Sequence, residues 1–316
     1  MFANILIWLL VVVLVILLIW LITRIWRIRP WLVRWPALLL TGLLALVLAA
    51  VGVLGAIGLI KTYVPTGNPP SALVVQPTPA MLQRGQHIAD VFCASCHAPA
   101  GQTALIGGVD LAGDIPIPVG SFVSVNLTPG GPLKNWTDGE ILRVLREGVA
   151  PDGSPLAIMG GINIRFMSDD DLHALIAYLR SLPAVDHPTQ TPPDQANFIG
   201  ILVFAAGLAP AQPAVTGPIT APPKAASVDY GQYILSYQDC RSCHGADLNG
   251  GTSKITPNGP SLKAVKSWTQ AQFINTMRTG MTPNGSQLKP LMPYKQIGLM
   301  DDEELGAIYQ YLSTRW

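Results

Sequence analysis

The chain is poor in charge and in cysteine. Only 12% of its 316 residues are charged, 49% are hydrophobic, and the net charge is +1. This composition argues against a disordered chain and offers no basic surplus for nucleic acid, so we expect no nucleic-acid partner. Four cysteines are too few for a disulfide scaffold, and they fall into two Cys-x-x-Cys pairs, Cys93/Cys96 and Cys240/Cys243.

Residues 1–60 contain no acidic residue and no lysine. Their only charged side chains are four arginines, which lie between two apolar runs, 5–23 and 37–60. About 20 helical residues span the ~30 Å hydrocarbon core, so we expect two transmembrane helices that form a hairpin. The positive-inside rule places the arginine-bearing connection in the cytoplasm and everything after residue 61 on the periplasmic or extracellular side of the cell membrane.

A cleaved signal peptide is the competing interpretation of the first run. The run is long for such a peptide and no basic residue precedes it, so we favour the hairpin. No histidine occurs before His87 and no acid before Asp90, which excludes histidine-ligated b-type haem and carboxylate proton relays from both helices. The hairpin is therefore expected to be an anchor in the lipid bilayer. A stripe of small residues on its second helix predicts close packing on the first helix or on a partner subunit; it comprises Ala45, Ala49, Gly52 and Ala56.

Proline-rich stretches divide the rest of the chain. We expect a hairpin at 1–61, an extended spacer at 62–80, domain 1 at 81–183, a linker at 184–226, and domain 2 at 227–316. Inside the linker, the apolar segment from Phe198 to Leu208 is too short to span a bilayer. It is expected to pack between domains, with contact to the membrane surface as the alternative.

The two domains resemble each other. Segments 135–154 and 267–286 align without gaps, with seven of 20 residues identical. Each begins with a helix-start signal, Thr137 with Glu140 and Thr269 with Gln272. Closing helices follow Ser168 and Asp301, so the order is helix, cysteine pair, helix, helix. This predicts an all-α fold with two small domains in tandem, each needing a staple or cofactor to complete its core.

Each cysteine pair is followed directly by a histidine, giving Cys93-Ala-Ser-Cys96-His97 and Cys240-Arg-Ser-Cys243-His244. Cys-x-x-Cys-His is the attachment signature of c-type haem: each thiol forms a thioether, and the histidine directs a ring nitrogen at the iron. A zinc site would need further ligands, but residues 198–316 hold no other cysteine or histidine. A redox dithiol would accompany a βαβ pattern, which this sequence lacks.

The second axial ligand is narrowed by elimination. Domain 2 has no spare histidine, so the ligand must be one of its methionines, and we choose Met292 because it lies on a loop before the closing helix. The alternatives are Met277, Met281 and Met300. In domain 1, Met159 occupies the matching loop and is the candidate, in competition with His87, His173 and His187.

Both domains resemble class I cytochrome c domains, and the closest pattern is that of cytochrome c subunits of membrane alcohol and sugar dehydrogenases. The resemblance rests on the haem motifs and on blocks such as Asn126-Leu-Thr-Pro129 and Met167-Ser-Asp-Asp-Asp-Leu172. It implies two covalently bound haems c. Their ligands would be Cys93, Cys96, His97 and Met159 in domain 1, and Cys240, Cys243, His244 and Met292 in domain 2. The family commonly carries three haems and another anchor, and has proline where Gly160 follows Met159.

With both axial positions filled, the iron offers no site for a substrate, which favours electron transfer over catalysis. We expect a membrane-anchored dihaem relay without its own substrate site. The main interpretation is a subunit of a respiratory or photosynthetic quinol-oxidising or oxidase complex that passes electrons to a soluble carrier or terminal oxidase. A cytochrome subunit of a membrane dehydrogenase is the alternative. A dihaem peroxidase ranks below both, because it needs a haem whose distal ligand can leave.

Overall fold

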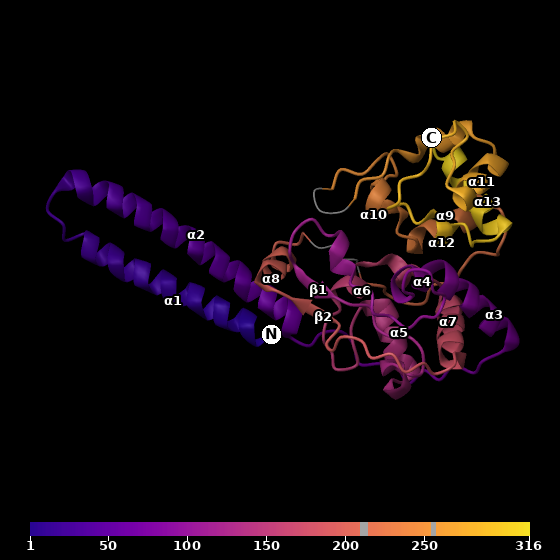
Figure 1. The fold of residues 1–316 in the computed structure, drawn as a ribbon, viewed down its shortest axis with the longest axis horizontal. Coiled ribbons are helices and arrows are strands. Elements are labelled where there is room, and N and C mark those ends of the chain that lie inside the picture. The colour runs from indigo at the N-terminus through magenta and orange to yellow at the C-terminus, as the bar shows by residue number, and fades with distance from the viewer. Residues whose placement is uncertain (209–213, 254–256) are drawn as a thin grey trace.

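The computed structural model describes residues 1–208, 214–253 and 257–316, and it is mostly helical (Figure 1). Two long helices, α1 (Phe2–Ile25) and α2 (Trp31–Tyr63), form a hairpin that extends away from the two domains. Both helices are long and apolar enough to cross a membrane, by length and composition. Both run past the predicted limits. In α2, Pro36 lies near the start, where it removes one backbone hydrogen bond without ending the helix.

The small-residue stripe of α2 faces α1. Trp8 Nε1 donates a hydrogen bond of 2.8 Å to the carbonyl oxygen of Gly52, and Ala45 is buried. A β-carbon at Gly52 would lie 3.7 Å from the Val11 side chain. Of the two expectations for this stripe, packing on the first helix is therefore the one observed.

Each domain is built on two crossing helices. In domain 1 these are α3 (Pro79–Ile88) and α7 (Asp169–Ser181), and in domain 2 they are α9 (Val228–Tyr237) and α13 (Asp302–Thr314). A β-carbon at Gly85 would lie 2.0 Å from the carbonyl oxygen of Ala174, and one at Gly231 would lie 2.0 Å from that of Ala307. Only glycine permits so close a crossing, so Gly85 and Gly231 are equivalent positions.

Shorter elements complete the domains. Those of domain 1 and the linker are η1 (Ala89–Cys93), α4 (Ala94–His97), η2 (Leu111–Asp114), β1 (Gly120–Phe122), η3 (Pro132–Asn135), α5 (Asp138–Glu147), α6 (Ala157–Gly161), η4 (Asn163–Phe166), β2 (Asp194–Ala196) and α8 (Phe198–Ala205). Those of domain 2 are α10 (Cys240–His244), η5 (Leu262–Ser267), α11 (Gln270–Thr279) and α12 (Tyr294–Ile297).

The predicted helix starts are confirmed. Thr137 and Glu140 form a reciprocal capping box at α5, and Thr269 with Gln272 does the same at α11. Asp301 and Glu304 cap α13, while the Ser168 side chain accepts a hydrogen bond from the Asp171 backbone at α7. These caps satisfy backbone N–H groups that the first helical turn leaves without partners.

The spacer after α2 is extended, as expected, and it lies along domain 1. The Thr66 backbone N–H donates to the carbonyl of Gly153 at 2.8 Å. Asn68 donates to Glu147, and the Val75 backbone donates to Asp138, both at 2.9 Å. The spacer therefore belongs to the packing of domain 1.

A short two-stranded sheet joins domain 1 to the linker, and the all-α prediction did not include it. Strands β1 and β2 pair antiparallel, with Gly120 opposite Ala196. The helix that follows, α8, packs against α2 and domain 1, so the prediction that it lies between the two domains was wrong. Sequence periodicity cannot detect strands of three residues.

Candidate haem sites

The eight predicted haem ligands and attachment residues line one continuous cavity of about 1470 Å³, which both domains enclose. These residues are Cys93, Cys96, His97, Met159, Cys240, Cys243, His244 and Met292. The volume of this cavity exceeds the range of about 300–1000 Å³ that is typical of a pocket for one small molecule. The walls are mainly apolar and include Trp136 and Trp268, the aligned tryptophans of the two repeats.

The two motif histidines are held in the same way. His97 Nδ1 lies 2.8 Å from the carbonyl oxygen of Val125, and His244 Nδ1 lies 2.7 Å from that of Pro260. A ring whose Nδ1–H donates to a carbonyl presents the lone pair of Nε2 to a metal. Burial lowers the pKa of His97, although the bond to Val125 opposes this, and so favours the neutral ring that a metal ligand needs.

The four cysteine thiols have raised pKa values, whereas a redox-active thiol has a lowered one. Burial raises the pKa of Cys93 and of Cys240 to about 12, and it also raises the pKa of Cys96 and Cys243. Redox dithiols and thiolate metal ligands need lowered pKa values. Thioether attachment removes the ionisable proton altogether, so these buried thiols fit haem c better than either alternative.

The cavity narrows the choice of methionine. Met159 lies on α6, and Met292 lies in the loop just before α12. Both are half-buried at the cavity wall. Met277 also lines the cavity, but it aligns in the repeat with Leu145, another wall residue, and it is buried within α11. Among the described residues, Met281 and Met300 do not line the cavity.

The competing histidines of domain 1 are placed differently. His187 lines the cavity, but its carbonyl oxygen accepts from Asn126, the neighbour of Val125, so it lies on the His97 side. Within the part of the chain that the structure describes, His87 and His173 stay outside the cavity wall. Taken together, the described residues fit two haem groups, each with a histidine and a methionine.

The loop that follows Met159 in domain 1 contacts the residue before the Cys-x-x-Cys-His motif of domain 2. Asn163, just after α6, donates to Asp239 Oδ1 through its backbone N at 3.2 Å and through Nδ2 at 2.7 Å. Asp239 directly precedes Cys240, and burial raises its pKa to about 6 against the effect of these bonds. In the reverse direction, α12 of domain 2 contacts η1 of domain 1. Each methionine loop therefore reaches the neighbouring motif.

Two equivalent pairs join the domains across this interface. His87 Nε2 lies 2.6 Å from Glu304 Oε2, and the Tyr233 hydroxyl lies 2.6 Å from Asp171 Oδ2. His87 and Tyr233 each follow the equivalent glycines by two residues, while Asp171 and Glu304 are both third in their capped helices. The domains thus meet through approximately two-fold related surfaces, like the identical patches of a symmetric dimer.

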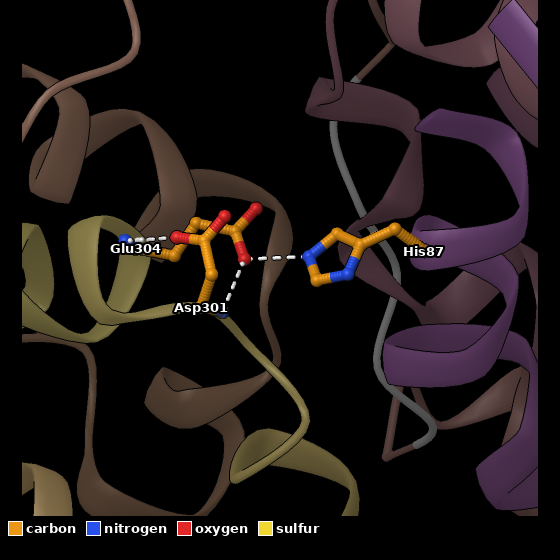
Figure 2. Close-up of side chains that lie close together, drawn as sticks. All are labelled: His87, Asp301 and Glu304. Atoms are coloured by element: carbon orange, nitrogen blue, oxygen red, sulfur yellow. Dashed lines mark hydrogen bonds and ion pairs between the residues drawn. The ribbon is translucent and has the colours of Figure 1, made fainter. Parts of the chain in front are cut away.

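Arg84 pairs with the two carboxylates of this interface, one from each domain. Its guanidinium contacts Asp171 at 2.7 Å and Glu304 at 2.8 Å, and Figure 2 shows the His87 ring pointing at Glu304 from the other domain. His87, Asp301 and Glu304 are close enough to hold a metal ion. Because Arg84 and His87 already supply partners to Glu304, this cluster needs no cation for charge balance.

Sequence reasoning missed several residues that line the cavity or lie beside its wall. Asn163 and Asp239 join the two sites, and the buried Arg165 donates to the carbonyl of Gly160 at 2.8 Å, beside Met159. The carboxylate of Asp194 lines the cavity, and burial raises its pKa to about 6 against a bond from Ala157. The aligned tryptophans were visible in the repeat and could have been assigned to the cavity. The others carry no sequence signal of their own.

Known families match each domain separately. Residues 82–183 match the model described as cytochrome c, and residues 226–312 match the one described as cytochrome c oxidase, cbb3-type, subunit III. Domains of this kind bind haem c covalently through the Cys-x-x-Cys-His motif.

Curated relatives are subunits of dehydrogenases. A nicotinate dehydrogenase subunit of Pseudomonas putida is 28% identical over 74% of this chain and 21% of its own length. The cytochrome c subunit of a quinone alcohol dehydrogenase from Gluconacetobacter polyoxogenes is 25% identical over 71% of this chain and 46% of its own length. The fructose dehydrogenase cytochrome subunit of Gluconobacter japonicus is 31% identical over 36% and 26%.

The chain thus spans less than half the length of these relatives. Two of the three are named as cytochrome subunits, and the two haem motifs of this chain each lie inside one of the regions that match a cytochrome family. The chain therefore contains two cytochrome c domains in tandem behind two apolar N-terminal helices.

Proposed function

We propose that the chain is a membrane-anchored dihaem relay, which binds two haems c and passes electrons between a membrane complex and a second carrier. The observation that carries the proposal is the shared cavity, lined by both complete sets of cysteines, histidine and methionine. Haem c, when bound at each set, supplies a one-electron redox couple. His97 with Met159 and His244 with Met292 are the proposed axial ligands.

The surrounding residues support a relay rather than an enzyme. The carbonyls of Val125 and Pro260 orient the two histidine rings, and the apolar walls keep water from the ligands. A methionine is available to each proposed site, which leaves no open axial position for a substrate or peroxide. Spectra of two low-spin haems that ignore added peroxide would exclude a peroxidase.

The domain interface supports electron passage within one chain. The bond between Asn163 and Asp239 joins the segment after Met159 to the one before Cys240, and Arg84 joins both domains through Asp171 and Glu304. These contacts are buried or half-buried and fix the two domains beside each other. Relative motion of the domains would therefore not be needed for an electron to cross.

The relatives favour a dehydrogenase complex as the partner. Their names describe cytochrome subunits of alcohol and fructose dehydrogenases, so the source of electrons would be a dehydrogenase subunit in the same membrane. A quinol-oxidising or oxidase complex is the second candidate, favoured by the match of 226–312 to an oxidase subunit. In either case the arginine-bearing turn of the hairpin would be cytoplasmic and both haems would lie on the periplasmic or extracellular side.

Native purification tests the assignment. The full chain is extracted in mild detergent, its partners are identified, and the haem is followed optically while the substrate of a recovered dehydrogenase is added. Haem reduction by that substrate supports the dehydrogenase role, and reduction by quinol through a recovered quinol-oxidising complex supports the second candidate. A chain recovered alone, which neither donor reduces, would contradict both roles.

A further inference from the structure

Helix α8 has an apolar outer face that nothing in the described part of this chain covers. One face packs inward: Ile201 is fully buried, and the Phe204 ring meets Phe122 edge-on with centroids 5.9 Å apart. The opposite face consists of Ile199, which is 46% exposed, together with Leu202 and Ala206. A surface helix in water normally carries polar residues on its outer face. Yet the sequence has no charged residue between Asp194 and Lys224.

The position of α8 along α2 gives its depth. A β-carbon at Gly58 would lie 2.2 Å from the carbonyl oxygen of Ile201, and one at Gly55 would lie 3.3 Å from the Phe198 ring. Counted from residue 37, where the predicted apolar run of this helix begins, about 20 helical residues cover the ~30 Å hydrocarbon core. The far boundary of the core then falls near Ile57, between the two glycines. Figure 1 shows α8 beside this end of α2, next to domain 1.

The ends of α8 are closed by protein groups. Asn197 accepts a hydrogen bond from the Gly200 backbone at 3.0 Å, and the Leu208 N–H donates to the carbonyl of Val203 at 3.1 Å. Lys61 Nζ, at the end of α2, lies 3.4 Å from the carbonyl oxygen of Phe204. A helix end in contact with lipid needs such partners, because no water is present to replace them.

We propose that α8 is an interfacial membrane helix whose outer face contacts the acyl chains of the leaflet nearest the haem domains. The proposal rests on the membrane anchor of the proposed function. Lipid is the occupant favoured by the observations, because the face continues the exposed apolar surface of α2, where Ile57 is 38% and Ile60 is 60% exposed. An apolar face at this depth binds the bilayer in proportion to the area that it buries.

This contact would position the first haem site. Ala157 and Ile158, next to Met159, pack on the same cluster as Ile201 and Phe204. Asn4, near the start of α1, donates to the Tyr63 hydroxyl at 2.8 Å and to the Ala196 carbonyl at 2.7 Å. Domain 1 is therefore fastened at the membrane boundary through both helices of the hairpin and through α8.

Spin labels in the full chain test the proposal. Single cysteines are introduced as Ile199→Cys, Ile16→Cys near the middle of α1, and Leu291→Cys on domain 2, and each is labelled with a nitroxide in phospholipid nanodiscs. Ile16 is 59% and Leu291 is 60% exposed, so they match Ile199 in accessibility but report lipid and water, respectively. The unsubstituted chain, treated identically, gives the background label. Collisions with oxygen and with a water-soluble nickel chelate are then measured.

The expected result is an oxygen-to-nickel collision ratio at position 199 that is several-fold above the ratio at 291 and close to that at 16. A ratio at 199 equal to that at 291 would overturn the proposal while leaving the anchor intact. Protection of position 199 from both reagents would also overturn it, because a second copy of the chain would then cover the face. Nickel access at position 16 as well would overturn the anchor together with the helix.

Discussion

Domain 1 and domain 2 share one frame but differ in their surroundings. Both cross their outer helices at a glycine, Gly85 and Gly231, and both direct their motif histidine with a backbone carbonyl. Domain 1 is covered by the spacer after α2 and by the linker with β2, while domain 2 leaves Leu291 and Leu299 60% and 56% exposed. The same histidine geometry is thus covered by the chain leading from the apolar hairpin in one copy and is more exposed in the other.

We infer that the two domains have different electron-transfer partners. Domain 1 would stay near the membrane complex, and domain 2 would exchange electrons with a mobile carrier, because the spacer and the linker cover much of domain 1. A more sheltered, less polar setting also changes the potential of a haem.

Removal of one cysteine pair should remove one haem. We expect Cys240→Ala with Cys243→Ala to halve the haem absorbance per chain, and Cys93→Ala with Cys96→Ala to do the same, since each pair would hold one group. The absorbance of the reduced haem, divided by protein concentration, measures this. Full haem content in either double variant would break the equivalence of the two domains.

Removal of one methionine should give different consequences in the two domains. Met292→Ala and Met159→Ala should each turn one haem high-spin and lower its potential, because the iron loses an axial ligand. Added carbon monoxide should bind faster to reduced Met292→Ala, whose loop is exposed, than to Met159→Ala, whose loop packs beneath α8 and β2. Equal binding rates would remove the claimed difference in coverage, and unchanged spectra would assign the ligands elsewhere.

Loss of a charge at the interface between the domains should lower the free energy of unfolding more than loss of a charge on the surface. Glu304→Gln should lower the free energy of unfolding by about 1.5–3 kcal/mol, the usual contribution of a hydrogen bond to a charged group. Asp302→Asn on the same helix is the matched control: its pair with Arg278 is exposed, and its loss should cost about 0–1 kcal/mol. Denaturant unfolding of the full chain checks both. Equal effects would mean that the Glu304 contacts contribute no more than a surface pair.

Acid should weaken the interface at Glu304. Burial alone would raise its pKa, but hydrogen bonds and charges from His87 and Arg84 outweigh burial and lower the pKa to about 2. A depressed pKa stabilises the folded chain above the ordinary value of 4.5, and this stability is lost as the pH falls toward 2. The stability difference between the native chain and Glu304→Gln should therefore shrink over this range. A constant difference would contradict the assigned pKa.

Local sequence signals predicted much of the fold. The capping residues, the two apolar helices and the repeated helix order followed from patterns within a few residues, and the structure has them. The eight predicted haem residues share a cavity, because the repeat places them at matching points of one frame. Long-range contacts were not predictable: His87 meets Glu304 and Ile201 meets Gly58 across distant parts of the sequence, where no local periodicity applies.

We propose that one chain carries two covalently attached haems in the cavity between its domains. The most direct test is the mass of the denatured, full-length protein, purified from a host that attaches haem c. We expect the mass of the polypeptide plus two haems, retained after denaturation because thioether bonds hold them. A mass increased by a single haem, or the mass of the bare polypeptide, would contradict the claim.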